Sequence, residues 1–141
     1  MYRINEGTIY LPAEWQDRTI NVVSSAMGAL PGLSLTITRD DIPWGMGFDE
    51  YVEGQLEQAG QALKSFQPGE RRAVNLGGTP AVEVECHWTA KQGPIHQIIT
   101  TVQNGPQKAL VLTASMGGRM SEGQKAEMRR IVSTLKLDKR G

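Results

Sequence analysis

The sequence predicts an α+β fold, a twisted and largely antiparallel sheet of about six to seven strands packed with two main helices. Two observations lead to this prediction. Runs in which apolar and polar residues alternate occupy most of the chain, and this period of two is typical of half-buried strands. Two other segments, one central and one near the end, repeat their apolar residues at helical spacing.

Seven strand-like runs are expected. In the first half of the chain they are Tyr2–Asn5, Thr8–Pro12, Arg18–Ser24 and, after a loop at Gly28–Gly32, Leu33–Asp40. In the second half they are Pro80–Lys91, Pro94–Gln103 and Lys108–Met116. Short turns rich in glycine and proline join the last three runs, which favours antiparallel hairpins.

Two helices are expected. The first covers residues 48–66 and ends before the breaker pair Pro68 and Gly69; its apolar stripe comprises Phe48, Val52, Leu56, Ala59, Leu63 and Phe66. The second begins at Ser121, which can form a capping box with Gln124. Its stripe comprises Met128, Ile131, Val132 and Leu135.

Length and composition bound the possibilities. The 141 residues fit a single domain, 1–141. Lysine plus arginine equal aspartate plus glutamate at 15 each, so nucleic acid is not expected as a partner. Cys86 is the only cysteine, which leaves no intrachain disulfide. The first residues lack an export signal, and no run approaches the roughly 18 apolar residues of a membrane span. We therefore expect a cytoplasmic protein without membrane anchoring.

Catalytic chemistry is scarce in the sequence. We expect no enzyme, no cofactor and no resident metal, because nucleotide-type glycine motifs and a nucleophile elbow are missing. His87 and His96 are the only histidines, and adjacent strands could bring them together as a metal pair with Glu85 as third ligand. The alternative is a pair of ordinary histidines on a partly exposed sheet face. Glu83 and Glu85 share that face and are interpreted as solubilising residues.

Two glutamines interrupt apolar surfaces. At about 100° per residue, Gln55 lies about 20° from Phe48, inside the apolar stripe of the first helix. Gln97 shares a strand face with Ile95 and Ile99. A buried amide without a partner costs roughly 1–3 kcal/mol, so both should be satisfied. Bonds to core backbone would suffice for Gln55; an apolar groove that still forms hydrogen bonds would suit a helix that normally lives in lipid.

An ordered set of residues resembles the Eag-type (effector-associated gene) chaperones of bacterial type VI secretion, within the DcrB-like group of Mog/PsbP-like folds. The set comprises Tyr2 to Glu6, Leu11, Pro12, Trp15 to Asp17, Ile20, Asn21, Thr38 to Asp40, Phe48, Tyr51, Val52, Gln55, Leu56, Trp88, His96 and Gln97. It covers nearly the whole chain in order and is densest in residues 2–66.

This resemblance implies a function. Chaperones of the family are homodimers that hold the amino-terminal transmembrane segments of a PAAR/Rhs-type secreted effector in an apolar groove. Carried over by position, the groove glutamines are Gln55 and Gln97. The other groove residues are Ile20, Val22, Thr36, Ala59, Leu63 and Ile95. The chain lacks an ATP motif, so client release is expected to occur by transfer to another apolar environment.

Two other interpretations stay open. One is a small-molecule binding module on the same fold, with a compact closed pocket. The other is an accessory protein that binds a soluble partner through its sheet edge or through the loop carrying Trp44.

Overall fold

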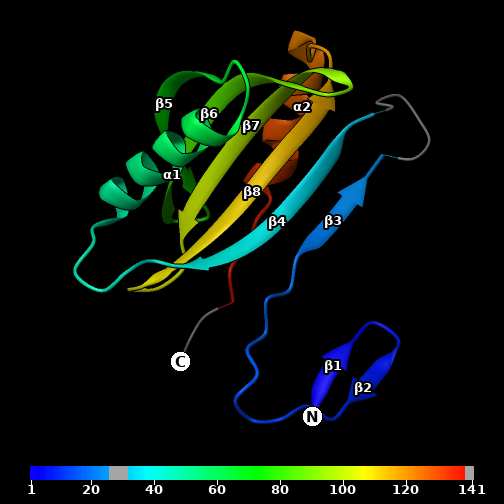
Figure 1. Cartoon of the computed structure of the whole chain (residues 1–141), viewed down its shortest axis with the longest axis vertical. Coiled ribbons are helices and arrows are strands. Elements are labelled where there is room, and N and C mark those ends of the chain that lie inside the picture. The colour runs from blue at the N-terminus through cyan, green and yellow to red at the C-terminus, as the bar shows by residue number, and fades with distance from the viewer. Residues whose placement is uncertain (26–31, 139–141) are drawn as a thin grey trace.

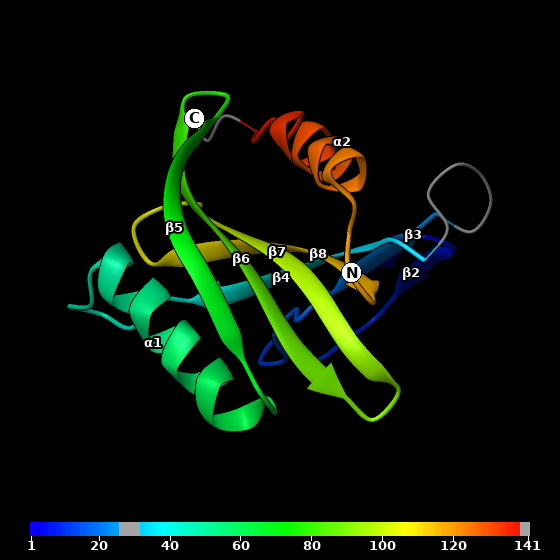
Figure 2. The ribbon, with the colours of Figure 1, turned by 90° about the horizontal axis from the view of Figure 1, so that it is seen from above.

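The computed structural model describes residues 1–25 and 32–138. A six-stranded sheet forms the body, helices lie on its two opposite faces, and a small two-stranded hairpin lies apart at the amino terminus (Figures 1 and 2). The predicted α+β class with a largely antiparallel sheet and two main helices is confirmed. Most of the predicted loop Gly28–Gly32 falls outside the described residues.

Every strand pairing in the described chain is antiparallel. The hairpin consists of β1 (Tyr2–Ile4) and β2 (Gly7–Ile9). The main sheet has the order β3-β4-β8-β7-β6-β5. Its strands are β3 (Asn21–Ser24), β4 (Ser34–Asp41), β5 (Gln67–Leu76), β6 (Thr79–Ala90), β7 (Gly93–Gln103) and β8 (Lys108–Gly117). The helices are α1 (Phe48–Ala62) and α2 (Glu122–Ser133).

The edge strand β5 was not predicted from the sequence. It is exposed along most of its length, and only Leu76 at its end is buried. Pro68 and Gly69 belong to it, where the pairing with β6 is irregular. An edge strand tolerates both, since one side of its backbone needs no partner. A Cβ at Gly69 would lie 3.0 Å from the carbonyl oxygen of Glu85, so this close approach of the two strands favours glycine.

Helix α1 is shorter than predicted, because the chain leaves the helical conformation at Leu63, where φ is −105° and ψ is 132°. Ser65 then adopts a φ of 56°. The carbonyl of Lys64 accepts a hydrogen bond from the Thr89 N–H at 2.9 Å, which ties the departing chain to β6. The prediction that α1 continues to Phe66 is therefore wrong, and Leu63 caps the helix.

The two sheet faces are covered to different extents. Met128 and Val132 of α2 pack into a large cluster on one face, which also contains Leu35, Ile98 and Leu112. On the other face only the first two turns of α1 are buried, in a small cluster: Ile42, Tyr51, Val52 and Ala109, flanked by Phe48, Leu56 and Val82. The rest of this second face has no covering helix (Figure 2).

The helices of the described chain are too short and too polar to span a bilayer. The capping box predicted at the start of α2 is present. The Ser121 hydroxyl accepts from the Gln124 N–H at 3.1 Å, and the Gln124 side chain accepts from the Ser121 N–H at 2.8 Å.

Candidate functional site

The uncovered part of the sheet beside α1 carries most of the residues predicted for binding. Side chains alternate between the two faces along each strand. Register pairs Gln97 with Ser115, Thr113 with Thr36, and Thr36 with Val22. These side chains therefore share one face, the same face as Val82 and Ala109 under α1. We call this surface the open face and define it as Val22, Thr36, Ile95, Gln97, Thr113 and Ser115.

The open face mixes apolar groups with hydroxyls and one amide. Thr36, Ile95 and Gln97 are half-buried, and Val22 is 65% exposed. The structure places these four predicted residues on one face of β3, β4 and β7, with β8 between β4 and β7. The sequence had placed only Ile95 and Gln97 on a shared face. A surface of this kind can cover apolar area and accept or donate hydrogen bonds.

Gln97 is held by three neighbours. Its Oε1 accepts from the indole Nε1–H of Trp88 at 2.9 Å and lies 4.0 Å from the sulfur of Cys86. Its Nε2 donates to the Ser115 hydroxyl at 2.9 Å. The sequence pattern did not link Trp88, Cys86 or Ser115 to Gln97. Only the strand register could have identified these neighbours, since the pairing of β6 with β7 places Cys86 opposite Gln97.

The predicted residues of α1 lie beside the open face. Gln55 is exposed, and Ala59 is half-buried. Val52 and Leu56 of the predicted stripe pack in the cluster beneath α1, so Gln55 lies outside the buried side of the helix, where its amide is open to solvent. Leu63 is half-buried but lies past the end of the helix, so its predicted place in the helical stripe does not apply.

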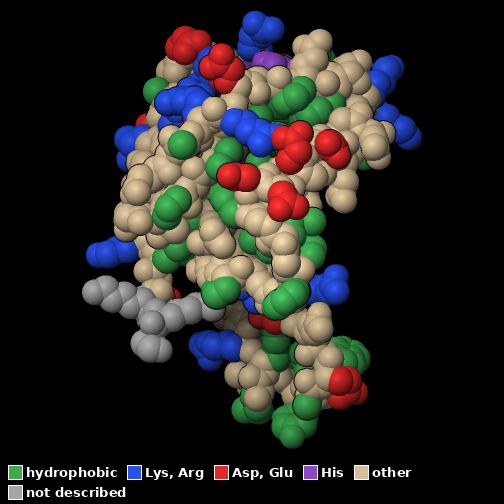
Figure 3. Space-filling model, turned by 90° about the vertical axis from the view of Figure 1, so that its left-hand side faces the viewer, with side chains coloured by type: hydrophobic (Ala, Val, Ile, Leu, Met, Phe, Trp, Pro, Cys, Tyr) green, Lys and Arg blue, Asp and Glu red, His purple; other side chains and the backbone are tan. Residues whose placement is uncertain are grey.

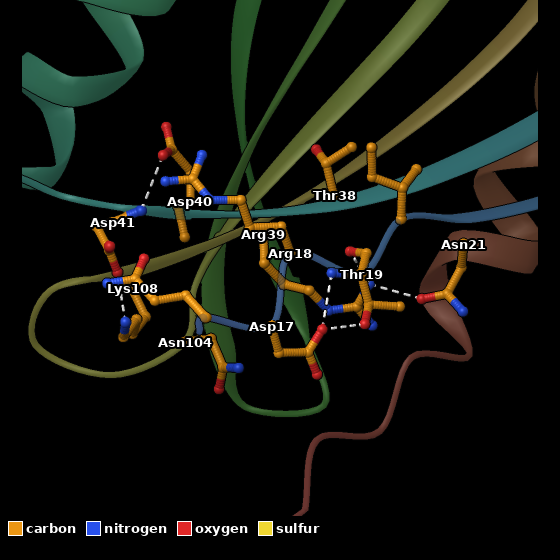
Figure 4. A pocket seen from close by; sticks show the side chains of 13 residues that line it. Asp17, Arg18, Thr19, Asn21, Thr38, Arg39, Asp40, Asp41, Asn104 and Lys108 are labelled. Carbon is orange, nitrogen blue, oxygen red and sulfur yellow. Dashed lines mark hydrogen bonds and ion pairs between the residues drawn. The ribbon is translucent and has the colours of Figure 1, made fainter. Parts of the chain in front are cut away.

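Ile20 lies just before β3 and is 60% exposed. It lines a hollow of about 1020 Å³ between the amino-terminal segment and the ends of β4 and β8 (Figure 4). Polar and charged groups dominate this hollow. Arg39 donates to the carbonyl of Thr19 at 3.2 Å and to the side chain of Asn21 at 2.6 Å, and thereby ties the segment to β4. This wide hollow is open to solvent and differs from the compact closed pocket expected of a small-molecule module.

The amino-terminal segment itself is apolar and exposed. Figure 3 shows hydrophobic side chains gathered on the hairpin that projects from the body. Among the described residues, eight of the eleven exposed large hydrophobic side chains precede residue 24. They are Met1, Ile4, Ile9, Tyr10, Trp15, Ile20, Val22 and Val23. This concentration could not be predicted from the sequence, because strand alternation gave no sign that the hairpin lies off the sheet.

The candidate metal ligands lie on the opposite face, toward α2. Ligand atoms of Glu85, His87 and His96 fall within 4.8 Å of one another. Both ring nitrogens of the buried His96 are occupied: Nδ1 accepts from the Met120 N–H at 2.8 Å, and Nε2 lies 2.8 Å from a Glu85 oxygen. Since Nδ1 accepts, Nε2 carries the proton and donates. This arrangement leaves His96 no lone pair for a metal and favours a structural role.

The acidic residues of β6 are not on a solvated face as predicted. Glu83 is only 6% exposed, and its carboxylate lies 3.0 Å from Arg129 and 3.4 Å from Arg72. Burial raises the pKa of Glu85, but the hydrogen bond from His96 and the charges of Lys125 and Arg129 outweigh it and lower that pKa overall. The solubility interpretation is wrong because α2 covers this part of the face.

Comparison with known proteins agrees with this architecture. A relative, Effector EagT6 of Pseudomonas aeruginosa, is 34% identical over 89 residues, which are 62% of this chain and 62% of that protein. The crystal structure of PA94, a protein of unknown function from Pseudomonas aeruginosa, superposes with a TM-score of 0.81 and 25% identity, over 99% of this chain and 96% of that one.

A weaker likeness is to the solution structure of cyanobacterial PsbP (CyanoP) from Synechocystis sp. PCC 6803. The TM-score is 0.49 with 14% identity, over 82% of this chain and 77% of that one. The family model named DcrB matches residues 6–134, which is nearly the whole sequence. The chain belongs to the DcrB family.

Proposed function

We propose that this protein is a cytoplasmic chaperone of type VI secretion, which shields the amino-terminal transmembrane helices of a PAAR-containing effector until export. The observation that carries the proposal is the open face, bordered by an α1 whose own apolar stripe is only half covered. Membership of the DcrB family and the similarity to a protein named Effector EagT6 support it.

The physical basis is passive shielding. Apolar area in water costs about 25 cal/mol per Å², so a bare transmembrane helix aggregates. Laid across the open face, such a helix would bury its apolar side chains against Val22, Ile95 and the stripe of α1. Hydroxyl and small side chains such as Thr36 and Ala59 allow a helix to approach closely. Gln55 and Gln97 would then bond to polar groups of the client.

The proposal includes a homodimer formed through the amino-terminal segment. A two-stranded hairpin is marginal by itself, and this one exposes most of its large apolar side chains. Together with Val23, the exposed apolar side chain of β3 outside the open face, they present on the order of 1,000 Å², above the few hundred Å² usual for a monomer patch and near the ~800 Å² per partner of a stable interface. A second copy of this chain would cover that area.

Co-expression tests the client assignment. The chaperone is produced with the tagged amino-terminal membrane segments of a neighbouring PAAR-domain protein, and soluble complex is measured after affinity capture. We expect complex with the wild type and little with a Gln55→Ala, Gln97→Ala double variant. The control is Gln61→Ala, an exposed glutamine on another side of α1. Aggregation of the segments with the wild type would refute the client assignment.

Light scattering coupled to gel filtration tests the dimer. We expect the wild type at twice the chain mass and a Tyr10→Ser, Trp15→Ser variant at the monomer mass. Trp44→Ser is the matched control, because Trp44 is 89% exposed but lies outside the amino-terminal segment. A monomeric wild type at micromolar concentration would rule out the dimer without touching the client assignment.

A further inference from the structure

We propose that the open face presents Gln97 as an oriented hydrogen-bond donor, held by Trp88, and so selects client helices that bring a hydrogen-bond acceptor to this point. The inference rests on the proposed function, since it concerns what the open face binds. It adds a positioning residue, Trp88, and a chemical requirement on the client.

Trp88 determines which way the amide of Gln97 points. An indole N–H can only donate, so the atom it meets at 2.9 Å must be the amide oxygen. If the Gln97 amide were turned over, its NH2 group would face the indole N–H of Trp88, and two donors would meet without an acceptor. Trp88 and Gln97 are both half-buried, on adjacent strands. The orientation therefore follows from the chemistry of the indole and not from the shape of the amide.

The thiol of Cys86 lies close to the same amide oxygen of Gln97. Its sulfur lies 4.0 Å from Gln97 Oε1, and its side chain is fully buried. Burial, and then the charge of Glu85, raise the pKa of this thiol to about 11, so it keeps its proton near neutral pH and can donate weakly. With Trp88 and Cys86 both donating, the two lone pairs of the oxygen are in use.

The nitrogen of the amide is only half used. One Nε2 hydrogen goes to the Ser115 hydroxyl at 2.9 Å, and within residues 1–25 and 32–138 the second has no acceptor. In the isolated protein, water can reach this half-buried group. A client lying on the open face would displace that water. The amide then offers the client one donor and no acceptor.

The requirement on the client follows. A transmembrane helix uses its own backbone carbonyls internally. An acceptor must therefore come from a serine, threonine or amide side chain, or from a carbonyl freed at a helix break. A purely apolar helix would leave the N–H unsatisfied in a dry interface, which corresponds to a loss of affinity of roughly 10- to 100-fold.

Two synthetic peptides test this requirement directly. Both are Leu/Ala helices with lysine ends, and they differ at one position that carries O-methylserine in one and norvaline in the other. These side chains have the same shape, but only the ether oxygen accepts a hydrogen bond. The position is moved stepwise along the peptide so that one register meets Gln97. We expect the ether peptide to bind the wild type at least 10-fold more tightly in that register.

Variants separate positioning from general packing. In Trp88→Phe the amide loses the donor that fixes its orientation, so the preference for the ether should weaken while the norvaline peptide still binds. Gln97→Met should also lose the preference. Ser115→Ala should keep it, because the oxygen stays held and an N–H remains free. Trp44→Phe is the matched control. Thermal unfolding verifies that each variant is folded.

The outcomes are distinct. Equal binding of the two peptides to the wild type in every register would overturn the donor inference and leave the open face as a general apolar surface. An ether preference as strong in Trp88→Phe as in the wild type would overturn the positioning role of the indole. If neither peptide binds the wild type, the proposed function fails, and the inference fails with it.

Discussion

Buried charge is concentrated in a few side chains beneath α2. The Glu83 carboxylate bonds to Arg129 of α2 and lies near Arg72 of β5, so one acid links three elements. Glu85 joins Arg129, Lys125 and His96 in the same way. Buried carboxylates need such partners, since an uncompensated charge is costly in a low dielectric. These side chains anchor α2 to the sheet by specific pairs as well as by apolar packing.

Removal of Arg129 should destabilise the fold. Arg129→Leu leaves Glu83 with Arg72 alone, and we expect a loss of about 2 kcal/mol in the free energy of unfolding, measured in urea. The neighbouring Arg130 pairs only with Glu127 on the exposed side of α2. Arg130→Leu is therefore the control and should cost about 0.5 kcal/mol or less. Equal losses of unfolding free energy in the two variants would show that the buried ion pairs of Arg129 stabilise the fold no more than the exposed pair of Arg130.

His87 should make the fold sensitive to mild acid. Burial, followed by the neighbouring His96 and Arg119, lowers its pKa from 6.5. The unfolded chain therefore binds more protons below about pH 6.5, and stability falls as the pH drops through that value toward the folded-state pKa. Glu85, whose pKa is lowered from 4.5, adds a further loss in stronger acid.

Urea midpoints at about pH 7.5 and about pH 5.5 measure the histidine contribution. The wild type should lose more stability between the two conditions than His87→Gln. An identical pH dependence in both proteins would contradict the assignment to His87.

At the scale of elements, the two helices differ in what holds them. α2 has a complete capping box and packs Met128 and Val132 into the main cluster. α1 begins at Gly47 without a side-chain cap and buries only Tyr51 and Val52. α1 is thus the less strongly attached helix and the one that borders the open face. A weakly attached α1 can shift its position beside the open face to fit a client helix.

Loss of the α2 cap should be measurable. Ser121→Ala removes the acceptor for the Gln124 N–H, and we expect a loss of about 1 kcal/mol in unfolding free energy. Ser133→Ala at the other end of α2, where the hydroxyl bonds only to the Arg130 carbonyl, should cost less. A larger effect at Ser133 would indicate that the end of α2, and not its start, limits stability.

At the scale of the whole molecule, stability and the proposed binding use different sheet faces. The main core lies under α2 and includes Val102, which is 0% exposed. The open face lies on the other side and contributes little buried area. Substitutions on the open face should therefore affect binding without unfolding the protein.

A pair of valine variants tests this separation. Val22→Lys should change the unfolding free energy by about 0.5 kcal/mol or less but reduce capture of the client helices, because it places a charge on the open face. Val102→Ala should cost roughly 2 kcal/mol yet leave capture unchanged at a temperature where it is folded. Loss of capture in the second variant alone would argue against the open face.

Local patterns were enough for much of this protein. Alternation located β6, β7 and β8, helical spacing located both helices, and the Ser121 cap followed from two residues three apart. These signals are local, since each depends on the side chains of one element meeting one apolar surface. β5 escaped detection because an exposed edge strand needs no apolar face, and α1 ended early because a contact with Thr89, distant in sequence, redirected the chain at Lys64.

Only the tertiary structure decided which surfaces are covered. The sequence alone determined that Gln97 lies on an apolar strand face and Glu83 on a polar one. It did not determine that α2 covers the face of β6 that carries Glu83, or that much of the sheet face that carries Gln97 has no covering helix. Nor did it determine that Trp88, Cys86 and Ser115 surround Gln97. Those features depend on strand register and helix placement, which are set by contacts between residues far apart in the chain.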